Sequence, residues 1–267
     1  MTKKYGNDVK YIKRRGRVSK TLRRLFYFVF VLVVAISFGQ VFAGAMVGNL
    51  NLHIFGQRDK VKVKKEIYYG IKMGEYTDLN DAKTTANIVS QAGGGGYVWQ
   101  DGSKYVVLGS VYLNEVDCEK VVNNLSENYK ASVYDITLKK CKFTIEDISK
   151  KEQLKIKDIV EFCNLTFEEL YKISIDYDTG NISNIAVSAK SNSLKSKVIA
   201  NKNQIDLLNI KYNSENLTLI YNALQSIEDI LELLTNQMLT TENNLNLVKY
   251  AFIDILRVSF DLRNGLK

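Results

Sequence analysis

Few side chains in this sequence have the chemistry that catalysis needs. The single histidine, His53, rules out a zinc site with two histidines, a Ser-His-Asp triad and a Cys-His pair. Glu168 and Glu169 have the residue type that cleaves glycosidic bonds, although adjacent glutamates are more common on a solvated helix face. The four glycines at 93–96 are not followed by the Gly-Lys-Ser/Thr of a phosphate-binding loop. We therefore expect no enzymatic activity, no metal and no cofactor.

Side chains suited to binding without catalysis lie on expected strands. Residues alternate over 66–73, which places Ile71 and Met73 on a core-facing side and polar or aromatic side chains on the other. Trp99 lies on a neighbouring strand, where packing in the core is the alternative to a binding role. The alternation favours four further residues for the second face: Tyr68, Lys72, Lys104 and Val106.

The positive charge of the chain is concentrated at its N-terminus. Residues 1–24 hold ten of the 37 Lys and Arg residues and one acidic residue, so the rest of the chain is close to neutral. The basic surface that binds nucleic acid is therefore not expected in the folded part.

An uncharged, mostly apolar run follows this basic tail. It covers residues 25–50, which is long enough for a helix that crosses a bilayer. The positive charges before it predict a cytoplasmic N-terminus and an exterior position for everything after about residue 51. The alternative is a signal peptide cleaved at Ala43-Gly44-Ala45.

Residues 66–138 show six elements in the order β-α-β-β-α-β. Helices are expected after Asp78 or Asn80 and after Asn114, and Asp101-Gly102 is typical of a hairpin turn. This order predicts an antiparallel sheet with both helices on one face and the other face open. The expected strands are 66–73, 97–100, 104–111 and 131–138.

The remaining residues, 139–267, have heptad seams instead. The clearest seams run from Ile156 to Tyr177, from Leu217 to Met238 and from Leu245 to Leu262. They predict an antiparallel helical bundle or a coiled-coil oligomerisation module.

Three cysteines are too few for a disulfide framework in an exterior region of this size. Two alternatives remain for them. They are buried free thiols, or Cys141 and Cys163 form a bridge.

Two of the expected strands, 66–73 and 104–111, each have a glycine at or near their end, and their sequences resemble the SPOR domain family. That family has a strand close to Y-x-V-Q-L-G-A-F, a capped helix with an Ala, and a later strand close to Y-R-V-x-V-G-P-F. Here the first strand is Tyr69-Gly70-Ile71-Lys72-Met73-Gly74-Glu75-Tyr76, followed by Asp81-Ala82. The second is Tyr105-Val106-Val107-Leu108-Gly109-Ser110-Val111-Tyr112. The resemblance covers residues 66–138, about a quarter of the chain.

The resemblance implies non-catalytic binding of peptidoglycan glycan strands that lack stem peptides, at a division or sporulation septum. The family's open sheet face contacts the glycan, which here gives Tyr68, Lys72, Lys104 and Val106, with Trp99 beside them. Lys72 stands where the family often has Gln. Aromatic faces suit the C–H faces of sugars, and lysines donate hydrogen bonds to hydroxyl groups.

The expected architecture is therefore α+β with one transmembrane helix, a SPOR-like domain with an open sheet face and a helical bundle. The expected partners are glycan strands, membrane lipid, and division or sporulation proteins or a second copy bound through 139–267. A membrane-anchored scaffold that acts through the bundle is the main alternative function, and a glutamate-dependent glycan-cleaving enzyme is the next. An RNA-recognition module shares the β-α-β-β-α-β order, but its basic, aromatic third strand is missing. The expected segments are a tail 1–24, a spanning helix 25–50, a linker 51–65, the SPOR-like domain 66–138 and the bundle 139–267.

Overall fold

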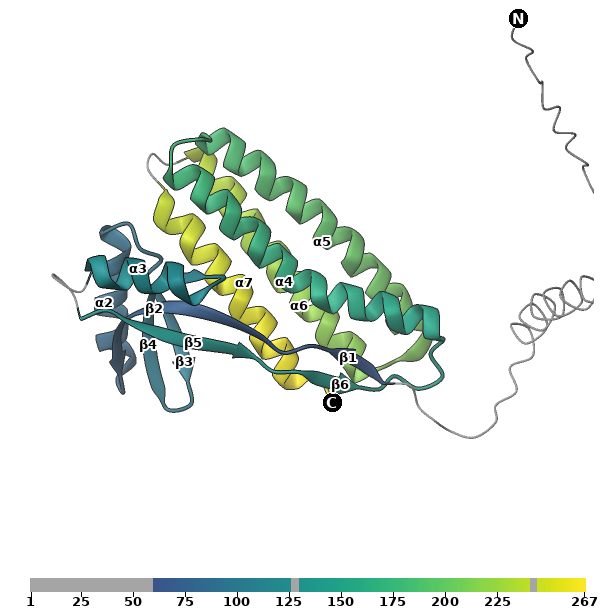
Figure 1. Ribbon diagram of the computed structural model, residues 1–267. Coiled ribbons are helices and arrows are strands. Elements are labelled where there is room, and N and C mark those ends of the chain that lie inside the picture. Colours follow the sequence, from purple (N-terminus) through teal and green to yellow (C-terminus); the bar gives the residue numbers. More distant parts are fainter. Residues whose placement is uncertain (1–59, 126–129, 241–243) are drawn as a thin grey trace, which may run out of the picture. The chain divides into compact units, whose positions relative to one another are not determined.

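The computed structural model describes residues 60–125, 130–240 and 244–267. These residues belong to one compact unit that begins at Arg58. The described part contains six helices and six strands (Figure 1), which confirms the α+β class.

The main sheet has four antiparallel strands in the order β3-β4-β2-β5. The sequence order of strands and helices over this region is the expected β-α-β-β-α-β. The elements are β2 (Glu66–Tyr76), α2 (Leu79–Gln91), β3 (Tyr97–Asp101), β4 (Lys104–Tyr112), α3 (Glu115–Leu125) and β5 (Ser132–Leu138).

Two irregularities interrupt the pairing of β2 with β4. Gly70 pairs with Val111 and Lys72 pairs with Leu108, so β4 has one extra residue between these two pairs. The next pair is Gly74 with Val107, so between Lys72 and Gly74 it is β2 that has one extra residue. A bulge of this kind bends the strand and changes the face to which the next side chains point. Gly109 and Gly74, the glycines shared by the two similar strand sequences, lie at these irregularities.

The helices α2 and α3 cover one face of the sheet. The Asp78 side chain caps α2 by accepting from the backbone N–H groups of Asn80 and Asp81. Gly96 returns the chain to the sheet with a φ of +58°, and a side chain there would meet the Ala86 carbonyl at 2.2 Å. Two small clusters form beneath the helices, around Val107 for α2 and around Ile71 for α3.

The C-terminal half is a bundle of long helices. The predicted seams are confirmed as core, because Phe167, Ile227 and Phe252 in them are fully buried. Ser149 and Glu152 form a capping box at the start of α4. The helices are α4 (Lys150–Asp178), α5 (Asn184–Tyr212), α6 (Glu215–Thr240) and α7 (Leu245–Gly265).

The expectation of an open sheet face is wrong. Helix α7 crosses the second face of the sheet (Figure 1) and contacts β3, β4 and β5. Polar contacts accompany it along its length: Tyr97 donates to Asp254 at 2.9 Å, and Arg257 donates to the Gln100 carbonyl at 2.6 Å. The sheet and the bundle consequently share one continuous hydrophobic core.

A second, two-stranded sheet joins the strand that precedes β2 to the strand that follows β5. It pairs β1 (Val61–Val63) with β6 (Cys141–Phe143) in antiparallel fashion. β1 falls inside the expected linker, 51–65. A strand of three residues is too short to give a period, so the pattern did not predict it.

The expectation of a transmembrane helix is also not met among the described residues. None of their helices combines the length and the apolar character that a membrane crossing requires. The segment 25–50, on which that expectation rested, lies outside the described residues, as do the tail 1–24 and residues 51–59 of the expected linker.

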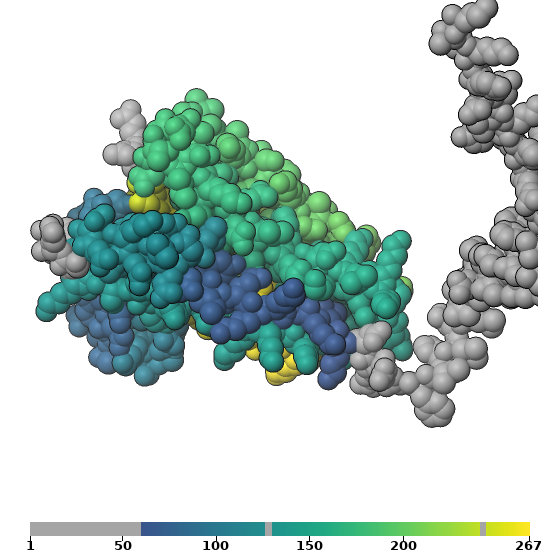
Figure 2. All heavy atoms as spheres, in the orientation of Figure 1, coloured from purple at the N-terminus to yellow at the C-terminus, as the bar shows by residue number. Residues whose placement is uncertain are grey.

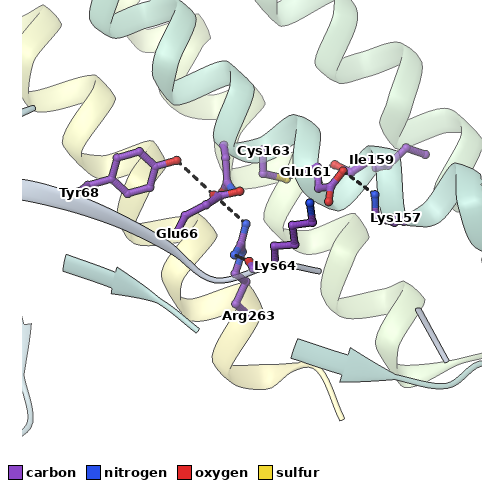
Figure 3. A network of polar contacts seen from close by, with 9 residues as sticks. Lys64, Glu66, Tyr68, Lys157, Ile159, Glu161, Cys163 and Arg263 are labelled. Atoms are coloured by element: carbon purple, nitrogen blue, oxygen red, sulfur yellow. Dashed lines mark hydrogen bonds and ion pairs between the residues drawn. The ribbon is translucent and has the colours of Figure 1, made fainter. Parts of the chain in front are cut away.

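An ion pair between a buried arginine and a partly exposed glutamate fixes the end of α7 to the start of β2. The Arg263 side chain is almost fully buried, and its Nη2 donates to Glu66 at 2.9 Å while Nη1 donates to the Lys64 carbonyl at 2.5 Å. Tyr68 and Asn164 also donate to the Glu66 carboxylate. Figure 3 shows this carboxylate between Tyr68 and Arg263. The contacts join β2, α4 and α7 at one point.

We predict that the sheet does not fold without the bundle. A fragment of residues 58–267 should unfold in one cooperative thermal transition, whereas a fragment of 58–138 should show none and should bind a hydrophobic dye. The physical reason is that Trp99, Val106 and Leu108 would face water in the shorter fragment. Circular dichroism melts and dye fluorescence measure this. A cooperative melt of 58–138 would contradict the prediction.

We predict that Glu66→Ala destabilises the 58–267 fragment by about 3 kcal/mol, since it leaves the Arg263 guanidinium buried without its carboxylate. Denaturant unfolding measures the change. Glu169→Ala is the matched control, because it removes a carboxylate from an exposed pair with Lys197; it should cost less than about 1 kcal/mol. Equal losses in the two variants would mean that burial adds nothing to the Glu66 pair.

Candidate functional site

Three of the five side chains predicted to bind a ligand are core residues. Trp99 is 2% exposed, Val106 1% and Tyr68 4%. The Trp99 ring lies 5.3 Å from that of Phe260 on α7, and the Tyr68 ring lies 4.9 Å from that of Phe167 on α4. These three residues therefore pack the sheet against the bundle, and we leave them out of the candidate site.

The other two predicted residues, Lys72 and Lys104, lie at the end of the sheet that α7 leaves uncovered. Both ammonium groups contact one carboxylate: Glu75 is 2.5 Å from Lys104 and 3.4 Å from Lys72. The sequence alternation would place Glu75 on the opposite face from Lys72. The extra residue in β2 changes this, so that Glu75 lies opposite Val106 and Tyr76 lies opposite Tyr105.

Two further polar side chains lie beside this trio. The Tyr134 hydroxyl on β5 donates to Asp101 on β3 at 2.8 Å, across the width of the sheet. Asp101 pairs with Lys104 in the β3–β4 hairpin. We call these five residues the polar strip: Lys72, Glu75, Asp101, Lys104 and Tyr134.

Arg257 of α7 borders the polar strip. Its guanidinium lies 5.0 Å from the Trp99 ring and 5.4 Å from the Phe260 ring. Its Nε donates to Asp261 at 2.8 Å. The arginine therefore shields the buried tryptophan from solvent and marks where the covered part of the sheet ends.

The charges of the polar strip influence one another. The hydrogen bond and the charge of Lys104 lower the pKa of Glu75, with a smaller effect of Lys72. The same hydrogen bond raises the pKa of Lys104. Burial, the hydrogen bond to Asp101 and the Asp101 charge raise the pKa of Tyr134. These shifts favour an ionised Glu75, a charged Lys104 and a neutral Tyr134 phenol at neutral pH.

This arrangement suits hydrogen bonding to a polyhydroxylated ligand. The cysteines are free and buried, so Cys141 and Cys163 form no bridge. Burial raises the pKa of Cys118 to about 11 and that of Cys163 to about 12, so these thiols stay protonated at neutral pH.

Glu168 and Glu169, the candidates for glycan cleavage, do not form a pair. Glu169 is exposed and lies 3.4 Å from Lys197, whereas Glu168 is half-buried and its pKa is raised by burial. Adjacent positions on a helix point in different directions. Within the described residues no cluster of three His, Cys, Asp or Glu side chains is placed to hold a metal ion. His53 lies outside the described residues.

Sequence reasoning found Lys72 and Lys104 but missed three members of the polar strip. The sequence pattern predicts only a turn at Asp101, and at Tyr134 it predicts a strand position without a role in binding. For Glu75 the available signal was Gly74, since a glycine inside a strand often marks a bulge.

Comparison with known proteins adds no relative. No protein-family model matches the chain, and neither a curated protein nor a solved structure does. The resemblance to the SPOR family consequently depends on the sequence motifs alone.

We predict that the pKa of Glu75 lies below the usual glutamate pKa of about 4.3. Lys104→Met should return the pKa of Glu75 towards that usual value. Because the folded-state pKa is the lower one, Glu75 contributes stability above its unfolded-state pKa and loses it as the pH falls. NMR titration of the Glu75 carboxyl carbon in the 58–267 fragment measures the shift. Lys120→Met is the control, since Lys120 pairs with Asp117 instead. An unchanged Glu75 pKa in Lys104→Met would refute the pairing.

Proposed function

We propose that the chain is a non-catalytic binding protein for peptidoglycan glycan strands, acting outside the cell membrane at division or sporulation septa. The observation that carries the proposal is the bulge in β2, which turns Glu75 to the same face as Lys72 and Lys104. Bulges are frequent next to binding sites because they redirect single side chains. The motifs shared with the SPOR family support the same ligand.

The two lysines suit the group that distinguishes stripped glycan from intact wall. When an amidase removes a stem peptide, it hydrolyses an amide and leaves a carboxylate on the lactyl group of the sugar. The Lys72 ammonium makes the longer contact with Glu75, at 3.4 Å, so it is the cation we expect to turn towards that carboxylate. A charge-assisted hydrogen bond of this kind is stronger than one between neutral groups.

Tyr134 and Asp101 would bind the neutral part of the sugar. The half-buried Tyr134 ring lies next to the sheet core and can pack on the C–H face of a pyranose. Carboxylates such as Asp101 and Glu75 accept hydrogen bonds from sugar hydroxyl and acetamido N–H groups. The strip therefore combines an apolar face with donors and acceptors around it.

A scaffold that binds a protein partner through the bundle is the second candidate. The heptad seams themselves are buried within this chain, so they are not free for a partner. The observation that favours a scaffold is the apolar exposure on the outer side of the bundle. Large apolar side chains are more than half exposed at Ile185, Leu207, Ile210, Leu233 and Leu239.

We predict that the 58–267 fragment sediments with sacculi and that more fragment sediments after an amidase has removed the stem peptides. Lys72→Ala and Lys104→Ala should each weaken binding by about tenfold, the usual effect of losing a charge-assisted hydrogen bond. Lys120→Ala is a closely matched control, because Lys120 also contacts a carboxylate three residues away at 3.4 Å.

No gain on the stripped wall would overturn the ligand, and full binding by both variants would overturn the site. Release of soluble muropeptides that stops in Glu168→Gln would instead indicate the glycan-cleaving enzyme.

A further inference from the structure

A groove lined by lysines lies between β1 and the start of α4. Its volume is about 310 Å³, and Lys60, Lys62, Lys150 and Lys157 line it together with Val61, Gln153 and Leu154. No acidic side chain is among these lining residues. Figure 2 shows the residues of β1 lying against those of α4 on the surface of the unit.

The groove is the centre of a larger concentration of positive charge. The two longer segments that contain its lining residues, 60–66 and 139–161, hold eleven lysines and six acidic residues. The remainder of 60–267 holds 15 basic and 21 acidic residues. The positive charge is therefore gathered at one place on a unit that is otherwise acidic.

Several of these ammonium groups are not neutralised. In the described part of the chain, Lys60, Lys62 and Lys150 make no side-chain hydrogen bond or ion pair, whereas Lys157 pairs with Glu161 at 3.0 Å. Lys62 also lies directly opposite Lys142 in the β1–β6 pairing. Like charges opposite one another destabilise a two-stranded sheet. An anion bound at this point would relieve that repulsion.

Apolar exposure accompanies the charge. Leu154, in the lining, is 56% exposed. Along the sequence, the uncharged apolar run 25–50 ends ten residues before Lys60. Lysines around an exposed leucine are typical of surfaces that contact lipid headgroups and the upper part of the acyl chains. Nucleic acid fits less well, because no aromatic side chain lines the groove to stack on bases.

We propose that this lysine groove binds the phosphate headgroups of an anionic phospholipid surface. The lysines contact the phosphates, and Leu154 enters the edge of the acyl region. The proposal is independent of glycan binding, since none of the groove residues belongs to the polar strip.

The test is sedimentation of the 58–267 fragment with vesicles of phosphatidylcholine alone and with vesicles of phosphatidylcholine and phosphatidylglycerol in equal parts. We expect binding only to the second kind, weakening as salt is raised. Each lysine removed should weaken binding about fivefold, so Lys62→Ala with Lys150→Ala should weaken it about 25-fold. The control is Lys83→Ala with Lys120→Ala on α2 and α3, which lowers the net charge equally and should bind like the unchanged fragment.

The proposal is overturned if both kinds of vesicle bind equally, or if the control variant loses as much binding as the groove variant. Soluble glycerol phosphate separates the two sources of the phosphate group. If it displaces the fragment from vesicles at a concentration matched to the lipid, the groove recognises free phosphate esters and not a membrane surface. Tighter binding to single-stranded RNA than to the vesicles would likewise reject the lipid assignment.

Discussion

The burial of the second face of the sheet is the constraint on which the rest of the structure depends. Residues 106–111 of β4 are all buried, so this strand has apolar contacts on both sides. A sheet of this kind needs a cover on each face. Helices α2 and α3 provide one, and α7, the last helix of the chain, provides the other with α4 beside it. The fold is therefore complete only when the last helix has docked, and the Arg263–Glu66 pair fixes the position of its end.

The same cover determines where a ligand can bind. Most of the sheet face that a SPOR-like domain would offer is occupied by Phe260 and Phe167. What remains accessible is the end near the β3–β4 hairpin, beyond the guanidinium of Arg257. The bulge in β2 lies at this end and supplies Glu75, without which the two lysines would repel each other on a bare surface. Because α7 and α4 cover most of this face and the bulge in β2 adds Glu75 at its free end, the accessible part of the face is the polar strip.

Much of the local structure could be predicted from the sequence, and the tertiary relations could not. Periodicity identified the strands around Ile71 and Leu108 and the helices around Phe167 and Phe252, because each pattern is contained in one segment. The contact of Trp99 with Phe260 joins residues more than 150 positions apart, and no sequence pattern in either segment predicts this contact. Alternation also placed Lys72 on the correct face, but it failed at Glu75, because one extra residue reverses the face of every later side chain.

The polar strip and the lysine groove differ in how their charges are balanced, and this difference predicts different ligands. In the strip each lysine already contacts a carboxylate, so its net field is weak and short-ranged. Such a surface favours a ligand recognised by many directed hydrogen bonds, as a sugar is. In the groove the lysines are mostly unpaired, so attraction extends over roughly a Debye length, about 8–10 Å, and favours any dense array of phosphates. Because the two surfaces lie on different elements, a substitution in one leaves the charged side chains of the other in place, so the two proposals can be tested separately.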